Sequence, residues 1–173
     1  MQFHMQEWMA KGLKATVQEK LDVSELFKGR ADVLAAGPLH VSLEVAGHEG
    51  FVTASGELSI DLDLACSRCL DKVEEHTVIP YFEQFKLASA EEKDEGPEAD
   101  ENDEFVEVPT ERLDLRPFLE EAVLVFMPFA PLCSKDCKGL CQSCGENLNE
   151  RACDCKHEVI DPRFAALKDL FKD

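Results

Sequence analysis

The sequence predicts an α+β fold, in which an antiparallel β meander is packed by a C-terminal helix and followed by a cysteine-rich tail. Three observations predict it. Apolar and polar residues alternate between residues 39 and 87, apolar residues recur at helical spacing from 115 to 126, and six cysteines lie between 133 and 155. Period-2 alternation is typical of half-buried strands, and a spacing of three and four residues is typical of an amphipathic helix.

The first half of the chain predicts mainly strands. Residues 21–29 indicate a short helix closed by Gly29. Residues 39–47 and 51–66 alternate, with a turn after Gly47. The apolar faces of these two strands are Leu39, Val41, Leu43 and Val45, then Leu58, Ile60, Leu62 and Leu64. A further strand at 72–87 is rich in β-branched and aromatic residues, so the sequence CSRC at 66–69 should lie at a hairpin tip.

The second half contains the clearest helix. Asp114 is a plausible N-cap, Pro117 is tolerated only in the first turn, and Pro128 ends the helix. Its predicted apolar face, which should pack on the sheet, is Leu115, Phe118, Leu119, Ala122, Val123 and Phe126. A terminal helix is expected after Asp161 and Pro162, with its apolar side made of Phe164, Leu167, Leu170 and Phe171.

Charge divides the chain. Residues 91–104 hold nine acidic side chains and one basic one, which indicates a solvated, flexible loop. We therefore predict four parts: a mainly antiparallel β domain at 1–89, an acidic flexible loop at 90–104, a strand and core helix at 105–132, and a cysteine-rich zinc module with a terminal helix at 133–173.

The net charge of −18 argues against direct long-range attraction to nucleic acid. It favours a basic protein partner, although residues 133–173 are nearly neutral, with 7 basic and 8 acidic side chains. No apolar run has the length of a bilayer span and no secretory signal is visible, so we expect a cytoplasmic protein without a membrane partner. Thiols in the cytoplasm stay reduced, which disfavours disulfides and leaves a metal site or a catalytic thiol.

The cysteine-rich tail predicts zinc binding. Zn²⁺ takes four tetrahedral ligands and binds thiolates well. Cys141, Cys144 and Gly145 have the form of a zinc knuckle, a tight turn whose amides donate to sulfur. The remaining candidate ligands are two pairs, one spaced by a helical turn and the other by two residues: Cys133 with Cys137, and Cys153 with Cys155.

Six candidates exceed one tetrahedron, and three arrangements stay open. One zinc could use four of them, two zincs could share ligands, or Cys66 and Cys69 could close a second site with two tail thiols. Free thiols and a redox centre are weaker alternatives, and His157 is a minor candidate ligand. We expect the knuckle to be indispensable, each pair to be partly redundant, and Cys66 to be separate from the tail zinc.

Several motifs resemble the YceD-like family, the bacterial large ribosomal RNA subunit accumulation proteins with chloroplast relatives. They are VSEL at 23–26, LACSRCL at 64–70, CKGLCQSCGENLN at 137–149, CDC at 153–155 and DPRFAALKDL at 161–170. The resemblance implies a role in accumulation of large-subunit ribosomal RNA, in a family encoded beside a ribosomal protein gene. Some members keep the upstream Cys-x-x-Cys but lack the tail cysteines, which implies that a tail metal is a structural aid.

The leading hypothesis is therefore a non-enzymatic factor in large-subunit ribosome assembly with a structural zinc. Its partner would be a ribosomal protein or an rRNA-processing factor, with pre-ribosomal RNA as a further candidate. Neither a phosphate-binding loop nor a nucleophile motif is found in the sequence. An RNA-processing enzyme or accessory nuclease factor is the alternative, and a zinc-dependent regulator is a third class.

Overall fold

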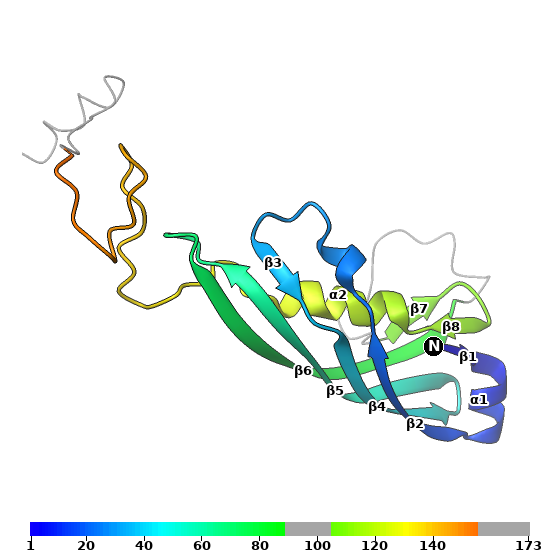
Figure 1. Cartoon of the computed structure of the whole chain (residues 1–173). Coiled ribbons are helices and arrows are strands. Elements are labelled where there is room, and N and C mark those ends of the chain that lie inside the picture. The colour runs from blue at the N-terminus through cyan, green and yellow to red at the C-terminus, as the bar shows by residue number, and fades with distance from the viewer. Residues whose placement is uncertain (89–104, 156–173) are drawn as a thin grey trace, which may run out of the picture.

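A computed structural model describes residues 1–88 and 105–155 (Figure 1). Its main sheet has six strands in the order β2-β4-β5-β6-β7, with β3 paired to β5. These strands are β2 (Lys14–Leu21), β3 (Val33–Ala36), β4 (Leu39–His48), β5 (Phe51–Ala65), β6 (Lys72–Leu87) and β7 (Phe105–Val108). A second, two-stranded sheet joins β1 (Gln2–His4) to β8 (Arg112–Asp114), and the helices are α1 (Met5–Lys11) and α2 (Arg116–Phe126). The fold is thus mostly β-sheet with a helix late in the chain.

The three long strands confirm the predicted meander. β4, β5 and β6 pair antiparallel in sequence order, and Leu58 lies opposite Val41 on one side and Ile79 on the other. All three side chains are buried, whereas the alternate residues of β4 are exposed until residue 45. A two-residue turn, Glu49 and Gly50, joins β4 to β5, because β4 runs one residue further than the alternation predicted.

Several elements depart from the sequence prediction. β7 pairs parallel to β6, so the sheet is not purely antiparallel. Its four residues are too few to show a direction-specific pattern. The helix expected at 21–29 is a single 3₁₀ turn, Ser24–Phe27, because β2 extends through Leu21.

The N-terminal segment forms β1, α1 and β2, none of which the sequence reading predicted. Helix α1 lies against β4, and a Cβ at Gly47 would overlap the backbone carbonyl of Trp8. Gly47 therefore permits the close approach of the helix backbone to the strand. Met5 is completely buried on the inner side of α1.

Helix α2 packs on the sheet, as predicted. Leu119 and Val123 are buried, and the ring of Phe118 lies 5.0 Å from that of Phe85 on β6. The predicted N-cap was wrong by one residue: Leu115 occupies that position and Asp114 ends β8, although Asp114 still accepts a hydrogen bond from the Arg116 amide at 3.1 Å. Phe126 was expected on the packed face but is 48% exposed.

Residues 131–155 follow α2 and lie beyond the tip of the β5–β6 hairpin, at the end of the sheet opposite α1 (Figure 1). The expected acidic loop at 90–104 and the expected terminal helix at 161–173 lie outside the described residues. Within residues 1–88 and 105–155, none of the helices has the length and apolar character needed to cross a membrane.

Candidate metal centres

The structure gathers the eight cysteines into two groups of four. The junction cluster consists of Cys66 and Cys69 from the β5–β6 hairpin tip with Cys133 and Cys137 from the segment after α2. The tail cluster consists of Cys141, Cys144, Cys153 and Cys155. In each cluster the four sulfur atoms lie within 4.8 Å of one another, and none of these thiols forms a disulfide. Either cluster could hold a metal ion.

The sulfur spacing suits one tetrahedral ion in each cluster. In the junction cluster, Cys66 Sγ lies 3.8 Å from Cys137 Sγ, and Cys69 Sγ lies 3.5 Å from Cys133 Sγ. Zn–S bonds of about 2.3 Å in a tetrahedron separate neighbouring sulfurs by about 3.8 Å. The sulfurs are therefore placed where the ligands of a single ion would be.

The tail cluster contains the predicted knuckle. The amides of Ser143 and Cys144 both donate to Cys141 Sγ at 3.4 Å, and the Gly145 amide donates to the Cys141 carbonyl at 2.9 Å. Gly145 has a φ of 75°, a backbone angle that glycine adopts without the steric cost other residues incur. The prediction of a turn that brings amides to sulfur is confirmed here.

The hairpin tip forms a second knuckle that the sequence reading did not recognise. The Leu70 amide donates to the Cys66 carbonyl at 3.0 Å, the same bond that Gly145 makes in the tail. Leu70 has a φ of 65° and is the one non-glycine residue with positive φ in the described residues. The missing glycine concealed the motif, but its Cys-x-x-Cys spacing was a signal that could have revealed it.

Backbone amides favour the thiolate form of the first cysteine in each knuckle. Burial alone would raise the pKa of Cys66, but donors from the backbones of Cys133, Cys69 and Arg68 together lower it to about 6. The Cys144 amide, against the effect of burial and with help from Ser143, lowers the pKa of Cys141 to about 6. The thiolate is the form that binds metals.

Two other cysteines of the clusters, Cys69 and Cys155, have pKa values that are raised. Burial raises the pKa of Cys69, and the Asp71 carboxylate, which accepts a hydrogen bond from that thiol at 3.2 Å, raises it further. Hydrogen bonding to the thiols of Cys144 and Cys141 raises the pKa of Cys155 to about 12. Because metals bind the thiolate form, a cation that binds these cysteines would release the protons of the thiols it engages.

The hairpin tip and the tail are docked together by backbone hydrogen bonds. Ser67 donates to the Pro131 carbonyl at 2.8 Å, and Leu140 donates to the Arg68 carbonyl at 3.1 Å. The Arg68 guanidinium donates to the Cys137 carbonyl at 2.8 Å. These bonds hold both halves of the junction cluster in register.

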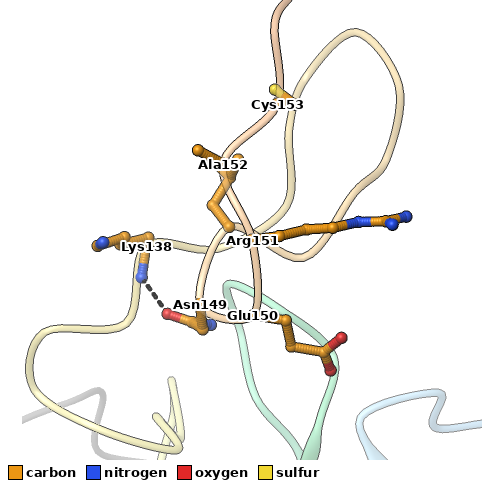
Figure 2. Close-up of a pocket in the computed structure, with 7 residues that line it drawn as sticks. Lys138, Asn149, Glu150, Arg151, Ala152 and Cys153 are labelled. Carbon is orange, nitrogen blue, oxygen red and sulfur yellow. Dashed lines mark hydrogen bonds between the residues drawn. The ribbon is translucent and has the colours of Figure 1, made fainter.

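Two asparagines support the ligands from the tail side. The Asn149 side chain accepts the Lys138 amide at 2.8 Å, shown in Figure 2, and donates to Cys137 Sγ at 3.3 Å. The hydrogen bond from Asn149 is the largest cause that lowers the pKa of Cys137. Asn147 donates to the Asp71 carboxylate at 3.0 Å, which links the tail to the hairpin once more.

A shallow cavity of about 310 Å³ lies beside the tail cluster (Figure 2). The side chains of Lys138 and Arg151 point to opposite sides of it, and Arg151 is paired with Glu146 at 2.6 Å. Its polar groups do not converge on one point, so the arrangement favours no small-molecule ligand. The lining residues are Lys138, Leu148, Asn149, Glu150, Arg151, Ala152 and Cys153.

All six predicted tail ligands lie in the two clusters, but they do not form one self-contained module. Cys66 lies outside the tail cluster, so its expected separation from the tail zinc stays a prediction. Cys133 and Cys137, however, lie with the two thiols of the hairpin tip and not with the tail knuckle. This is the third arrangement that the sequence left open. His157, the minor candidate, lies outside the described residues.

Relatives of the chain fall in bacteria and in a plant. Uncharacterized proteins of Mycobacterium bovis and Mycobacterium tuberculosis are 33% identical over 132 residues, which cover 76% of this chain and 61% of each relative. A protein of Arabidopsis thaliana named large ribosomal RNA subunit accumulation protein YCED homolog 1, chloroplastic, is 27% identical over 159 residues, covering 77% of this chain and 48% of that relative. The chain thus spans about three fifths of the length of the mycobacterial relatives.

The chain matches none of the solved structures. Residues 54–171, however, match the protein family described as large ribosomal RNA subunit accumulation protein YceD. The matched region includes most of β5, all of β6 and α2, and every cysteine of both clusters. On this evidence the chain belongs to the YceD family of large ribosomal RNA subunit accumulation proteins.

Proposed function

We propose that the protein is a non-enzymatic factor that supports accumulation of large-subunit ribosomal RNA during ribosome assembly. The observation that carries the proposal is membership of a family described by that role. The chloroplast relative bears the same description in its name. In this proposal the sheet is a scaffold, and the cysteine-rich tail is a recognition element stabilised by a structural zinc.

The tail zinc is assigned to Cys141, Cys144, Cys153 and Cys155. Four thiolates fill the coordination shell of Zn²⁺, whereas a catalytic zinc keeps one position open for water or substrate. The short distances among the sulfurs also suit a single ion better than a cluster of several irons. A closed site of this kind supports a structural metal and a non-enzymatic protein.

A surface for a partner lies between α2 and the junction cluster. We define the α2-end surface by its exposed apolar side chains, which are Leu124 (39% exposed), Val125 (72%), Phe126 (48%), Phe129 (102%) and Leu132 (36%). Five large apolar side chains so close in sequence are costly to leave in water, and contiguous exposed patches mark interaction sites. We assign this surface to a protein partner.

Charge supports a basic protein as the partner. From residue 117 to residue 134 the only charged side chains are Glu120 and Glu121, and the chain as a whole carries −18. The Glu121 carboxylate also lies near Glu83 of β6, whose pKa is raised by burial first and by Glu121 second. The strongly acidic chain suits a basic partner, and we propose a basic ribosomal protein as the occupant of the α2-end surface.

The test is recovery of the tagged chain from growing cells, with and without ribonuclease. We expect a basic large-subunit ribosomal protein to remain bound after ribonuclease treatment, and Phe129→Asp to reduce its recovery at least tenfold. Phe82→Asp is the matched control, because Phe82 is 60% exposed on β6 outside this surface. Loss of large-subunit precursors and ribosomal proteins from the wild-type sample would refute the proposal.

The enzyme alternative has its own measurement. Purified metal-loaded protein incubated with precursor ribosomal RNA should leave the RNA intact. Cleavage that disappears in Cys66→Ser would replace the proposal with an RNA-processing activity at the junction cluster.

A further inference from the structure

We infer that the junction cluster is a second metal centre, which clamps the tip of the β5–β6 hairpin to the segment after α2. The chain then binds two zinc ions in non-equivalent sites. The tail site is local, whereas the junction site joins residues 64 positions apart or more. This inference concerns the metal content of the purified protein and holds whether or not the ribosomal role is correct.

The burial and spacing of the thiols support a metal ion in the junction cluster. Cys66 is 0% exposed, and Cys69 and Cys137 are each 3% exposed, so three of the four thiols are buried side by side. Neighbouring sulfurs lie 3.5 and 3.8 Å apart, close to the spacing of the ligands of one tetrahedral zinc ion. Four sulfurs within 4.8 Å of one another, three of them on buried residues, form the ligand set of a single divalent ion.

The hairpin tip and the tail contain the same knuckle turn, which also supports a metal ion at each. Cys66 to Leu70 and Cys141 to Gly145 have the same carbonyl-to-amide bond, at 3.0 and 2.9 Å, and the same positive φ at the fifth residue. Leucine is disfavoured at this backbone angle, by about 1 kcal/mol. A bulky residue held in this conformation indicates that the turn is fixed by something outside it, and the metal supplies that constraint.

Apart from the hydrogen bonds described above, few contacts within residues 1–88 and 105–155 join the hairpin tip to the tail. The buried residues that join hairpin and tail are the cysteines Cys66, Cys69 and Cys137, with Val73 and Leu140 only partly buried against them. So small an apolar group contributes little to hold the tail in place. A tetrathiolate zinc contributes about 10 kcal/mol or more to folding in comparable modules, which is sufficient to decide whether the tail docks.

Counting metals in single and double variants tests the inference. We expect two zinc ions per wild-type chain and one per chain for Cys69→Ser, Cys133→Ser and Cys144→Ser. The double variant of Cys69 and Cys133 should still hold one, because both residues serve the same site. The double variant of Cys69 and Cys144 should hold none.

Two measurements keep the test decisive if a variant folds poorly. Titration of the metal-free wild-type chain with Co²⁺ should develop thiolate-to-metal absorption up to two equivalents. Limited proteolysis should cut residues 128–140 in Cys69→Ser but not in Cys144→Ser. Saturation at one equivalent, or two zinc ions retained in Cys69→Ser, would overturn the inference, and neither result would bear on ribosome binding.

Discussion

At the residue scale, backbone conformation decides how closely the tail approaches the hairpin. Gly139 and Gly145 have the same φ of 75°, but their surroundings differ. A Cβ at Gly139 would lie 3.0 Å from the Arg68 carbonyl oxygen, whereas a Cβ at Gly145 would meet nothing within 4 Å. Alanine at Gly145 therefore tests the cost of the backbone angle alone, whereas alanine at Gly139 adds the cost of the contact with Arg68.

Gly139→Ala should free the tail from the hairpin. The positive φ costs about 1 kcal/mol, and the contact with Arg68 adds about 1 to 3 kcal/mol by forcing the two backbones apart. We expect faster proteolytic cleavage within residues 128–140 of the metal-loaded protein. Gly145→Ala bears only the cost of the angle and should leave the cleavage rate of that segment unchanged; equal acceleration by both substitutions would show that the Arg68 contact is unimportant.

At the element scale, α1 and α2 are attached to the sheet by different means. Helix α1 places its backbone directly on Gly47 of β4, whereas α2 packs through side chains, among them Phe118 and Val123. The α2 contact also brings Glu121 near Glu83 of β6, and burial together with that like charge raises the pKa of Glu83. The attachment of α1 therefore depends on the absence of a side chain at Gly47, whereas the attachment of α2 brings two carboxylates close together.

Gly47→Ala should loosen the N-terminal helix. The added methyl overlaps the Trp8 carbonyl, which belongs to backbone and cannot rotate away. We expect a loss of about 2 to 3 kcal/mol in the free energy of unfolding, measured by urea denaturation. Gly37→Ala is the control, because its nearest neighbour would lie 3.4 Å away in ordinary contact; similar losses at both positions would contradict the account.

Glu83→Gln should stabilise the protein in a pH-dependent way. A raised folded-state pKa means that ionised Glu83 lowers stability at neutral pH, and this loss disappears as the pH falls below the pKa of the unfolded chain. We expect the variant to melt about 2 °C above wild type at pH 7, with the difference shrinking towards pH 5. Exposed Glu75 on the same strand provides the control, and a difference that grew on acidification would contradict the argument.

At the scale of the whole molecule, the sheet and the cysteine segment are stabilised by different forces. The sheet buries a continuous apolar core that runs from Met5 to Met127. Residues 131–155 contribute few buried side chains, namely Cys137 and Cys141 with the backbone at Pro131 and Gly139. Hydrophobic burial sustains the first, and ligation would have to sustain the second.

Removal of metal should therefore unfold one part of the molecule and spare the other. With a chelator present, we expect proteases to cut residues 131–155 while residues 1–88 stay protected and the far-ultraviolet spectrum keeps its β-sheet signal. Chain entropy of about 1 kcal/mol or more per residue exceeds what the few apolar contacts of the tail supply. Equal protection of residues 131–155 with and without the chelator would show that the tail folds without metal.

The sequence by itself determined the features that depend on neighbouring residues. Alternation marked β4 and β5 because side chains of a strand point to opposite faces in turn, and β-branched and aromatic residues marked β6. Helical spacing of apolar residues marked the buried face of α2. The spacing from Cys141 to Gly145 also predicted the tail knuckle, because its turn closes within five neighbouring residues. The terminal helix and the acidic loop stay predictions.

Only the tertiary structure decided which cysteines belong together. Cys66 and Cys69 lie beside Cys133 and Cys137 because the tip of the β5–β6 hairpin and the segment after α2 are at the same end of the sheet. No local pattern encodes that meeting, and Leu70 in place of glycine left the Cys-x-x-Cys spacing as the local sign of a knuckle at the hairpin tip. The sequence also did not predict the parallel pairing of β7 or the contact of α1 with Gly47, because both depend on the position of backbone that is distant in sequence.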